Sequence, residues 1–195
     1  QQGDRLPVST FAGYEDGTMS LGTTAYEKRG IATQIPVWDS TACIQCNRCS
    51  FVCPHAVLRP YLLDEAEAAG APGDFVSVPA KGAKGLSFSL QISEMDCTGC
   101  GCCAASCPMS GKALRMEPVT RELSVSPAWK YGLTLTEKNV FKVETVKGSQ
   151  FRQPLCEFSG ACAGCGETPY AKLLTQLYGD RMYWANATGC SQAWG

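Results

Sequence analysis

The sequence lacks several features that would assign it to common classes of protein. Its 195 residues contain no run of about 18 apolar residues, so no segment is a candidate membrane span. The formal net charge is only −1, and the chain therefore lacks the basic balance of a nucleic-acid-binding protein. The turn at residues 81–85 is rich in glycine and lysine but lacks the spacing of a phosphate-binding loop. We therefore expect neither a membrane nor a nucleic acid as a partner.

Cysteine, in contrast, is abundant, with 13 residues in the chain. Secreted disulfide frameworks are usually shorter than this chain and contain an even number of cysteines. Here the closely spaced cysteines occur in runs that end in proline, which suits metal binding in a reducing compartment better than disulfide bonding. We therefore expect most of these thiols to bind metal.

Eight of the cysteines fall in two runs with the same spacing, C-x2-C-x2-C-x3-C-P, at residues 43–54 and 97–108. This spacing is a strong signal for a [4Fe–4S] cluster, and two runs strengthen it further. Three thiolates spaced in this way wrap one face of a cube, whereas the fourth points away and reaches the other cube. The sequence therefore predicts two clusters with crossed ligands: Cys43, Cys46, Cys49 and Cys107 for the first, and Cys97, Cys100, Cys103 and Cys53 for the second.

Other interpretations of these residues are less favourable. Zinc sites usually take cysteine pairs set well apart rather than three cysteines at regular steps, so we do not favour zinc. Cys102 lies between two predicted ligands and is expected to be a spare thiol. His55, the only histidine, could donate a hydrogen bond to a cluster sulfur, but a packing or surface role is the expected one.

The two runs read as an internal duplication, and we predict an α+β fold in which residues 35–118 form a ferredoxin-like domain for two [4Fe–4S] clusters. The long spacer between the runs implies an inserted helix and loop. Pro60 suits the first turn of a helix from Tyr61 to Ala69, and alternating apolar residues predict a strand over 88–92. Residues 1–34 are predicted to form an extended connecting arm.

The rest of the chain divides into a linker over residues 119–155 and a different unit over 156–195. In that unit a helix is predicted, with Thr168 as its N-cap, Pro169 as its first residue and Gly179 just after its end. One face of this helix is apolar at helical spacing: Tyr170, Leu173, Leu174, Leu177 and Tyr178. A short strand over 182–185 is predicted to lead to a glycine turn and Cys190, an order typical of an α/β cofactor site.

The third group of cysteines is ambiguous from spacing alone. Cys162 and Cys165 form a C-x2-C pair that suits a redox disulfide, zinc or a cluster. Cys190 is a possible third ligand, and no fourth is obvious. Cys156 is the nearest candidate, but it is expected to pack as a buried thiol.

Five segments together resemble the pyruvate:ferredoxin oxidoreductase family: residues 146–154, 157–170, 26–32, 35–38 and 186–190. The resemblance covers nearly the whole chain and is more specific than the two cysteine runs, which would fit any ferredoxin. The family it indicates is a large thiamine-diphosphate enzyme that oxidatively decarboxylates pyruvate and passes electrons through three [4Fe–4S] clusters. This chain resembles its ferredoxin-like domain and the beginning of its C-terminal α/β thiamine-binding domain.

By that resemblance, Cys162, Cys165 and Cys190 are ligands of the cluster nearest the thiamine, with a fourth cysteine beyond Gly195. Glu167 and Cys190 correspond to positions close to thiamine diphosphate, which is bound with Mg²⁺ in the full enzyme. No catalytic residue is expected within this chain. The parts that bind pyruvate, CoA and the magnesium are not expected here.

The resemblance implies an electron-transfer segment of an enzyme that converts pyruvate, CoA and oxidised ferredoxin to acetyl-CoA, CO2 and reduced ferredoxin. The expected partners are ferredoxin or flavodoxin and the remaining domains of a homodimeric enzyme. The expected location is cytoplasmic or, alternatively, a reducing organelle such as a hydrogenosome or mitochondrion. These 195 residues alone are expected to be inactive. The alternative is a ferredoxin-type relay subunit of another oxidoreductase, such as a hydrogenase.

Overall fold

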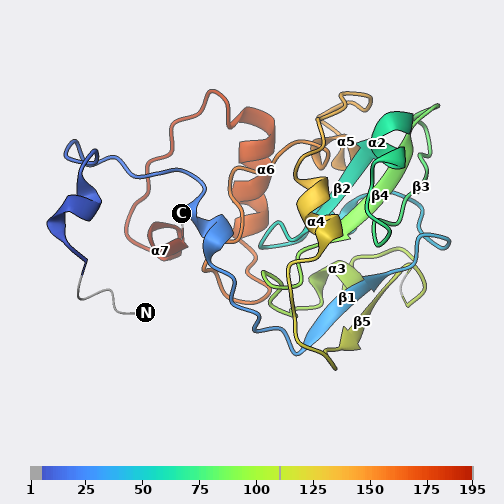
Figure 1. Ribbon diagram of the computed structural model, residues 1–195, viewed down its shortest axis with the longest axis horizontal. Coiled ribbons are helices and arrows are strands. Elements are labelled where there is room, and N and C mark those ends of the chain that lie inside the picture. The colour runs from blue at the N-terminus through green and yellow to red at the C-terminus, as the bar shows by residue number, and fades with distance from the viewer. Residues whose placement is uncertain (1–5, 110, 195) are drawn as a thin grey trace.

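The computed structural model describes residues 6–109 and 111–194, and it mixes short strands with short helices. The strands are β1 (Gln34–Trp38), β2 (Leu58–Leu63), β3 (Val78–Pro79), β4 (Ser87–Ile92) and β5 (Leu114–Pro118). The helices are α1 (Arg48–Phe51), α2 (Glu65–Ala69), α3 (Cys102–Ala105), α4 (Pro127–Gly132), α5 (Val146–Ser149), α6 (Thr168–Tyr178) and α7 (Cys190–Trp194). In Figure 1 the strands lie on the right, whereas α6, α7 and the N-terminal arm lie in the centre and on the left.

The strands form two small antiparallel sheets, and each sheet combines the two halves of the duplication. β1 pairs with β5, and the other sheet has the order β2-β4-β3. The first cysteine run lies between β1 and β2, and the second lies between β4 and β5. Because the strand before one run pairs with the strand after the other, the two runs are held side by side.

The predicted strand over 88–92 is confirmed as β4, but the predicted helix from Tyr61 to Ala69 is wrong in its first half. Tyr61 lies in β2, and the helix begins only at Glu65. β2 pairs with β4 on one side only, and proline is tolerated on such an edge strand, so Pro60 fits the strand as well as a first helical turn. Asp64 then starts α2 with a capping box.

The segment 119–155, predicted as a linker, contains α4 and α5 and closes one side of the core. The side chain of Ser126 accepts a hydrogen bond from the backbone of Trp129 and starts α4. Trp129 is only 2% exposed and meets Phe158 edge-on, with ring centroids 6.2 Å apart. It belongs to the same apolar cluster as residues of β2, β4 and both cysteine runs. This segment therefore contributes directly to the core around the cysteines.

The predicted helix after Pro169 is confirmed as α6, with two corrections. Glu167 rather than Thr168 occupies the N-cap position, and its side chain makes no capping hydrogen bond. The side of α6 that packs inward is also not the apolar one, because its buried residues are Thr168, Ala171, Lys172 and Gln176. Polar bonds hold this side: the amide of Gln176 accepts from Gln150 and donates to the carbonyl of Arg152.

The predicted strand over 182–185 is wrong, because residues 182–187 adopt no regular structure. A strand needs a partner for its backbone groups, and neither sheet of the described residues extends to this segment. Cys190 consequently does not follow a strand but begins α7, where it is exposed.

The N-terminal arm, from residue 6 to β1, contains no strand and is mostly exposed. It has two short 3₁₀ helices, Val8–Phe11 and Thr23–Tyr26. Its second helix is tied to the C-terminal part, because Thr24 donates a hydrogen bond to the carbonyl of Glu157 at 3.0 Å.

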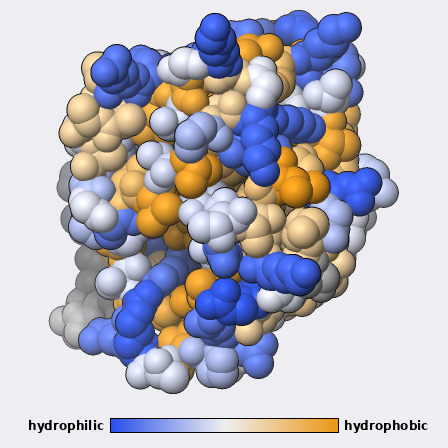
Figure 2. Space-filling model, turned by 90° about the vertical axis from the view of Figure 1, so that its right-hand side faces the viewer, coloured by the Kyte–Doolittle hydropathy of each residue, from blue (hydrophilic) through white to orange (hydrophobic). Residues whose placement is uncertain are grey.

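The outer surface of the strand side mixes residue types. Figure 2 shows hydrophilic and hydrophobic residues interspersed over the face that lies on the right of Figure 1. Across the described residues, no helix combines the length and the apolar character needed to span a membrane.

Candidate iron–sulfur centres

The two cysteine loops share one backbone conformation. In each loop, the second and fourth residues after the first cysteine have positive φ angles: Gln45 (59°) and Asn47 (60°) in the first, Gly99 (70°) and Gly101 (77°) in the second. Each loop leads into a one-turn helix, α1 or α3. Left-handed residues turn the chain sharply, so successive cysteines can face the same point. The equal spacing of the two runs therefore corresponds to equal geometry.

Both loops also make the same hydrogen bond to sulfur. The backbone N–H of Gln45 donates to Sγ of Cys43 at 3.3 Å, and that of Gly99 donates to Sγ of Cys97 at 3.4 Å. Donors directed at a sulfur stabilise negative charge on it. Each loop thus directs one backbone donor at the sulfur of its first cysteine, an arrangement that suits a thiolate bound to iron.

Side-chain hydrogen bonds hold the first loop where it lacks glycine. The buried amide of Gln45 donates to the carbonyl of Pro79 at 2.9 Å and accepts from the N–H of Lys81 at 2.6 Å. The buried amide of Asn47 donates to the carbonyl of Lys147, also at 2.9 Å. Left-handed φ angles cost energy in residues other than glycine, and these bonds offset that cost.

The first pocket among the cysteines is lined by Cys43, Cys46, Cys49 and Cys107. Its other walls are mainly apolar and come from both sheets, with Trp38 from β1, Leu114 from β5 and Phe88 from β4. Three of its cysteines therefore come from the first run, and the fourth is the last cysteine of the second run.

A second pocket has the reciprocal composition. It is lined by Cys97, Cys100, Cys103 and Cys53, so the last cysteine of the first run faces the loop of the second. Cys53, Cys97 and Cys103 are buried. Mainly apolar residues, with His55 and Thr98, complete the wall, and Cys102 does not line this pocket. The structure thus brings together the same two sets of four cysteines that the spacing predicts as ligands.

Burial makes free thiolates unfavourable in both pockets. It raises the pKa of Cys49 to about 12 and that of Cys97 to about 11, and neighbouring sulfurs of each pocket act in the same direction. Burial also raises the pKa of Cys103, and Cys53 adds to this effect. Sulfur ligands in such apolar surroundings need the positive charge of bound metal. The donor set and its surroundings therefore fit iron–sulfur clusters.

The cysteine side chains line pockets and do not converge on one position, as the ligands of a single metal ion would. In the part of the chain that the structure describes, no three Cys, His, Asp or Glu side chains form a group that could hold a single metal ion. This statement includes Cys162, Cys165 and Cys190, which the family resemblance assigns to a third cluster.

The third group of cysteines is more open than the first two. Cys162 and Cys190 are exposed, and Cys165 is partly buried. Burial alone would raise the pKa of Cys165, but hydrogen bonds from Thr168 and from the backbone of Glu167, at the start of α6, lower it below its usual value. Glu167 itself is exposed. The start of α6 is therefore suited to a thiolate at Cys165.

The C-x2-C loop lies against the second cysteine run. A Cβ atom added to Gly164 would lie 3.7 Å from Cβ of Cys100 and 3.7 Å from Sγ of Cys102. His55 makes a further link, because its Nδ1 donates to the carbonyl of Ser159 at 3.1 Å and its ring lines the second pocket. His55 is 3% exposed, and burial lowers its pKa. It therefore packs between the second pocket and the segment that leads to Cys162.

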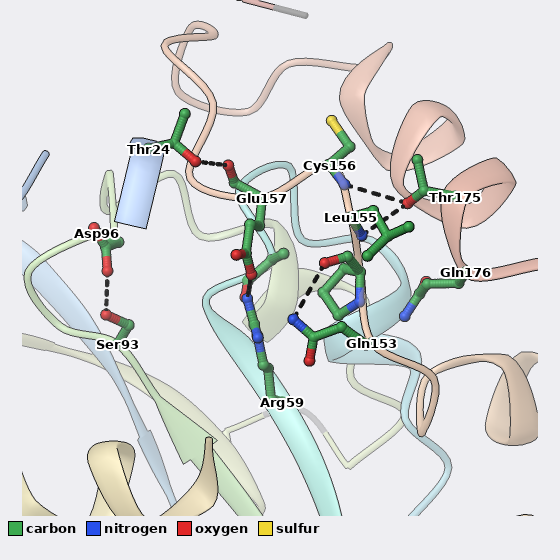
Figure 3. A network of polar contacts seen from close by, with 12 residues as sticks. Thr24, Arg59, Ser93, Asp96, Gln153, Leu155, Cys156, Glu157, Thr175 and Gln176 are labelled. Carbon is green, nitrogen blue, oxygen red and sulfur yellow. Dashed lines mark hydrogen bonds and ion pairs between the residues drawn. The ribbon is translucent and has the colours of Figure 1, made fainter. Parts of the chain in front are cut away.

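An ion pair that the sequence did not indicate joins the third region to the core. The guanidinium group of Arg59, in β2, pairs with the carboxylate of Glu157 (Figure 3). The same group lies 5.2 Å from the ring centroids of Trp129 and Phe158. The side chains of this pair are 6% and 17% exposed. The one available signal was an arginine within an apolar strand, which needs a buried partner.

Cys156 is tied into the same network but is not near a cysteine pocket. The backbone N–H groups of Leu155 and Cys156 both donate to Oγ1 of Thr175 in α6, at 3.1 and 3.3 Å (Figure 3). Cys156 is partly buried, and burial raises the pKa of its thiol. This placement fits a structural thiol.

Comparisons with known proteins agree with this site. Residues 42–110 match a 4Fe-4S dicluster domain, and residues 1–32 match a domain of unknown function. The chain is 58% identical over 196 residues to a pyruvate-flavodoxin oxidoreductase of Klebsiella pneumoniae and 60% identical over 198 residues to a pyruvate:ferredoxin oxidoreductase of Moorella thermoacetica. It is 54% identical over 199 residues to an NADP(+) pyruvate dehydrogenase of Cryptosporidium parvum.

Each alignment covers the whole chain, but the chain spans only 17% of the first two relatives and 10% of the third. The resemblance predicted from the sequence is therefore confirmed at the level of a segment. From end to end, the chain matches one segment of the pyruvate:ferredoxin and pyruvate-flavodoxin oxidoreductase family.

Proposed function

We propose that this chain is the electron-transfer segment of a pyruvate:ferredoxin or pyruvate-flavodoxin oxidoreductase. In this proposal it receives electrons released when pyruvate is oxidatively decarboxylated in the full enzyme and delivers them to ferredoxin or flavodoxin. The observation that carries the proposal is the pair of reciprocal cysteine pockets, each with three thiols from one run and one from the other. The names of the relatives support the same reaction and acceptors.

The proposed ligands are Cys43, Cys46, Cys49 and Cys107 for one [4Fe–4S] cluster and Cys97, Cys100, Cys103 and Cys53 for the other. When bound, the clusters supply one-electron transfer at low potential. The protein positions and insulates them: the loops direct backbone N–H groups at sulfur, and apolar walls limit the access of water. Close packing of the two loops keeps the proposed electron path short.

For the third region we propose a cluster held by Cys162, Cys165 and Cys190 with a further cysteine from outside these residues. The contact of the C-x2-C loop with the second run supports an electron path from this cluster to the second one. Residues 156–195 would then begin a domain that binds thiamine diphosphate with Mg²⁺ in the full enzyme, with Glu167 and Cys190 near the thiamine. Residues 1–34 would be an arm, 35–118 the two-cluster domain and 119–155 the connection.

A reducing compartment and a homodimeric full enzyme complete the proposal. All 13 cysteines are free thiols in the structure, which suits a reducing compartment such as the cytoplasm.

The decisive experiment is anaerobic purification of the full-length protein, followed by iron and acid-labile sulfide analysis and EPR of the reduced state. We expect two clusters from the paired runs and one more from the third region. Pyruvate, with CoA, should then reduce them and, through them, ferredoxin or flavodoxin. Zinc in place of iron, or clusters that pyruvate cannot reduce, would contradict the proposal; in the second case the chain would serve as a relay in another oxidoreductase.

A further inference from the structure

Lys172 in α6 is a buried cation without an acidic partner. It is 2% exposed, and among the described residues no carboxylate oxygen lies within 4.0 Å of its Nζ. The other buried charges of the described residues are paired: Arg59 with Glu157, and Asp96 with the partly exposed Lys28. An unpaired buried ammonium is costly unless another negative group compensates its charge.

The position of this ammonium group relates it to both cysteine pockets. Nζ of Lys172 donates to the backbone carbonyl of Ser50 and, at 3.2 Å, to that of Phe51. These carbonyls belong to α1, which contains Cys49 and ends two residues before Cys53. Cys49 lines the first pocket, and Cys53 lines the second. The ammonium is therefore anchored on the short segment that joins a sulfur of one pocket to a sulfur of the other.

The thiols influence Lys172 electrostatically. Burial lowers the pKa of Lys172 to about 8, whereas the sulfurs of Cys53 and Cys49 act in the opposite direction. A group with this pKa is still mainly charged at neutral pH. Negative charge in either pocket therefore stabilises the ammonium, and the ammonium stabilises negative charge there.

A purely structural role for Lys172 is the competing explanation, because a side-chain cation can satisfy free carbonyls at the end of a helix. The corresponding helix of the second half, α3, indicates that the fold does not need a cation at this position. α3 has the same length as α1 and follows the same loop geometry. Within the described residues, no side chain donates to the carbonyls of Ala104 or Ala105, which correspond to Ser50 and Phe51.

We propose that Lys172 is a buried counter-cation that raises the reduction potentials of both clusters proposed above. Reduction adds an electron to a site that is already negative, because four thiolates outweigh the charge of the core. A nearby positive charge in surroundings of low dielectric constant stabilises the reduced form. Among the described residues, Lys172 makes no hydrogen bond to a proposed ligand, so it acts through its charge. This inference rests on the proposed function, and it gives α6 an influence on clusters held by another part of the chain.

The test is an EPR-monitored redox titration of the full-length, cluster-loaded protein under anaerobic conditions. Lys172→Met keeps the size of the side chain and removes its charge, and it should shift the midpoint potentials of the two ferredoxin-type clusters to more negative values at unchanged iron content. Lys172→Arg keeps the charge and should restore potentials close to those of the wild type. Lys130→Met, the same change at an exposed position of α4, should leave the potentials unchanged.

If Lys172→Met loses iron, Lys172→Gln is measured in its place, because its amide can still donate to the carbonyls. Wild-type potentials in a neutral variant that retains both clusters would overturn the inference and leave the proposed function intact. Loss of iron in Lys172→Arg as well would also overturn it, in favour of a packing role. Absence of iron and sulfide from the wild type would instead contradict the proposed function itself.

Discussion

The paired cysteine runs and the third cysteine group differ in how completely the described residues enclose them. Each of the first two pockets has four thiols, apolar walls and a backbone donor to sulfur. The third group has three predicted ligands, of which Cys162 and Cys190 are exposed. The first two pockets are more enclosed because each sheet combines strands from both halves and thereby holds the runs together. The third group has no comparable pairing and depends on α6, α7 and a loop.

This difference indicates when a cluster site can form without residues from elsewhere in the full protein. In the paired runs, every proposed ligand is supplied by the described residues themselves. At the third site, the ligand loop contacts the second run, but its remaining surroundings are open. We therefore expect damage to a paired run to spread to its partner and damage to the third site to remain local.

The largest expected effect is that of Cys53→Ala. Because Cys53 lines the second pocket, its loss should disrupt the cluster on Cys97, Cys100 and Cys103 more than the cluster of its own loop. Iron analysis and cluster-resolved EPR of the anaerobic protein measure this. Cys102→Ala is the matched control, since Cys102 does not line the second pocket, and it should retain both clusters. Damage confined to the cluster of the Cys43 loop would refute the crossed arrangement.

Cys190→Ala in the full-length enzyme should have the next largest effect and test how local the third site is. We expect loss of the proposed third cluster, retention of both ferredoxin-type clusters and a collapse of ferredoxin reduction. Cys156→Ala, which removes a thiol outside every proposed site, should retain all clusters. If Cys190 is not a ligand, replacement of this exposed thiol should instead change stability by no more than about 0.5 kcal/mol, with normal iron content.

Glu157→Gln should weaken the connection between the third region and the core. It leaves the buried guanidinium group of Arg59 without its partner, which typically costs about 3–5 kcal/mol of unfolding free energy. Anaerobic denaturant titration of the cluster-loaded protein measures the loss. Glu117→Gln removes the exposed partner of Arg115 and should cost only about 0–1 kcal/mol. Equal losses in the two variants would show that the buried pair is not the connection.

The smallest expected effects separate two glycines of the second loop. Both have positive φ angles, so alanine at either position costs about 1–2 kcal/mol in backbone strain. A Cβ atom at Gly99 would also lie 3.0 Å from the carbonyl oxygen of Gln34, whereas nothing lies within 4 Å of one at Gly101. Gly99→Ala should therefore lower the thermal midpoint of the anaerobic protein more than Gly101→Ala. The opposite order would contradict the described packing of this loop against β1.

The parts of the fold that were predictable have strong local signals. The alternation of Phe88, Leu90 and Ile92 with polar residues predicted β4, and Pro169 with Gly179 marked the two ends of α6. Errors arose where one local pattern fits two structures. Pro60 suits both a first helical turn and an edge strand, and only the presence of β4 beside it decides for the strand.

Two further predictions differ from the structure because they depended on what packs against the segment. Residues 182–185 are apolar enough for a strand, but neither sheet of the described residues offers them a partner. α6 has an apolar face, yet Lys172 and Gln176 on another side make the inward hydrogen bonds. Periodicity identifies a face that can be buried, but it does not identify the neighbour that buries it.

By itself, the sequence determined which thiols could share a cluster, because the spacing of a C-x2-C-x2-C-x3-C run is a local property that limits where each sulfur can point. In the second loop it also provided Gly99 and Gly101, which adopt positive φ at no steric cost. Only the tertiary structure decided which charged side chains lie near those thiols. The Arg59–Glu157 pair spans 98 positions and the bonds of Lys172 to α1 span more than 120. Burial and pairing of charge depend on contacts between segments so far apart, and no local pattern encodes them.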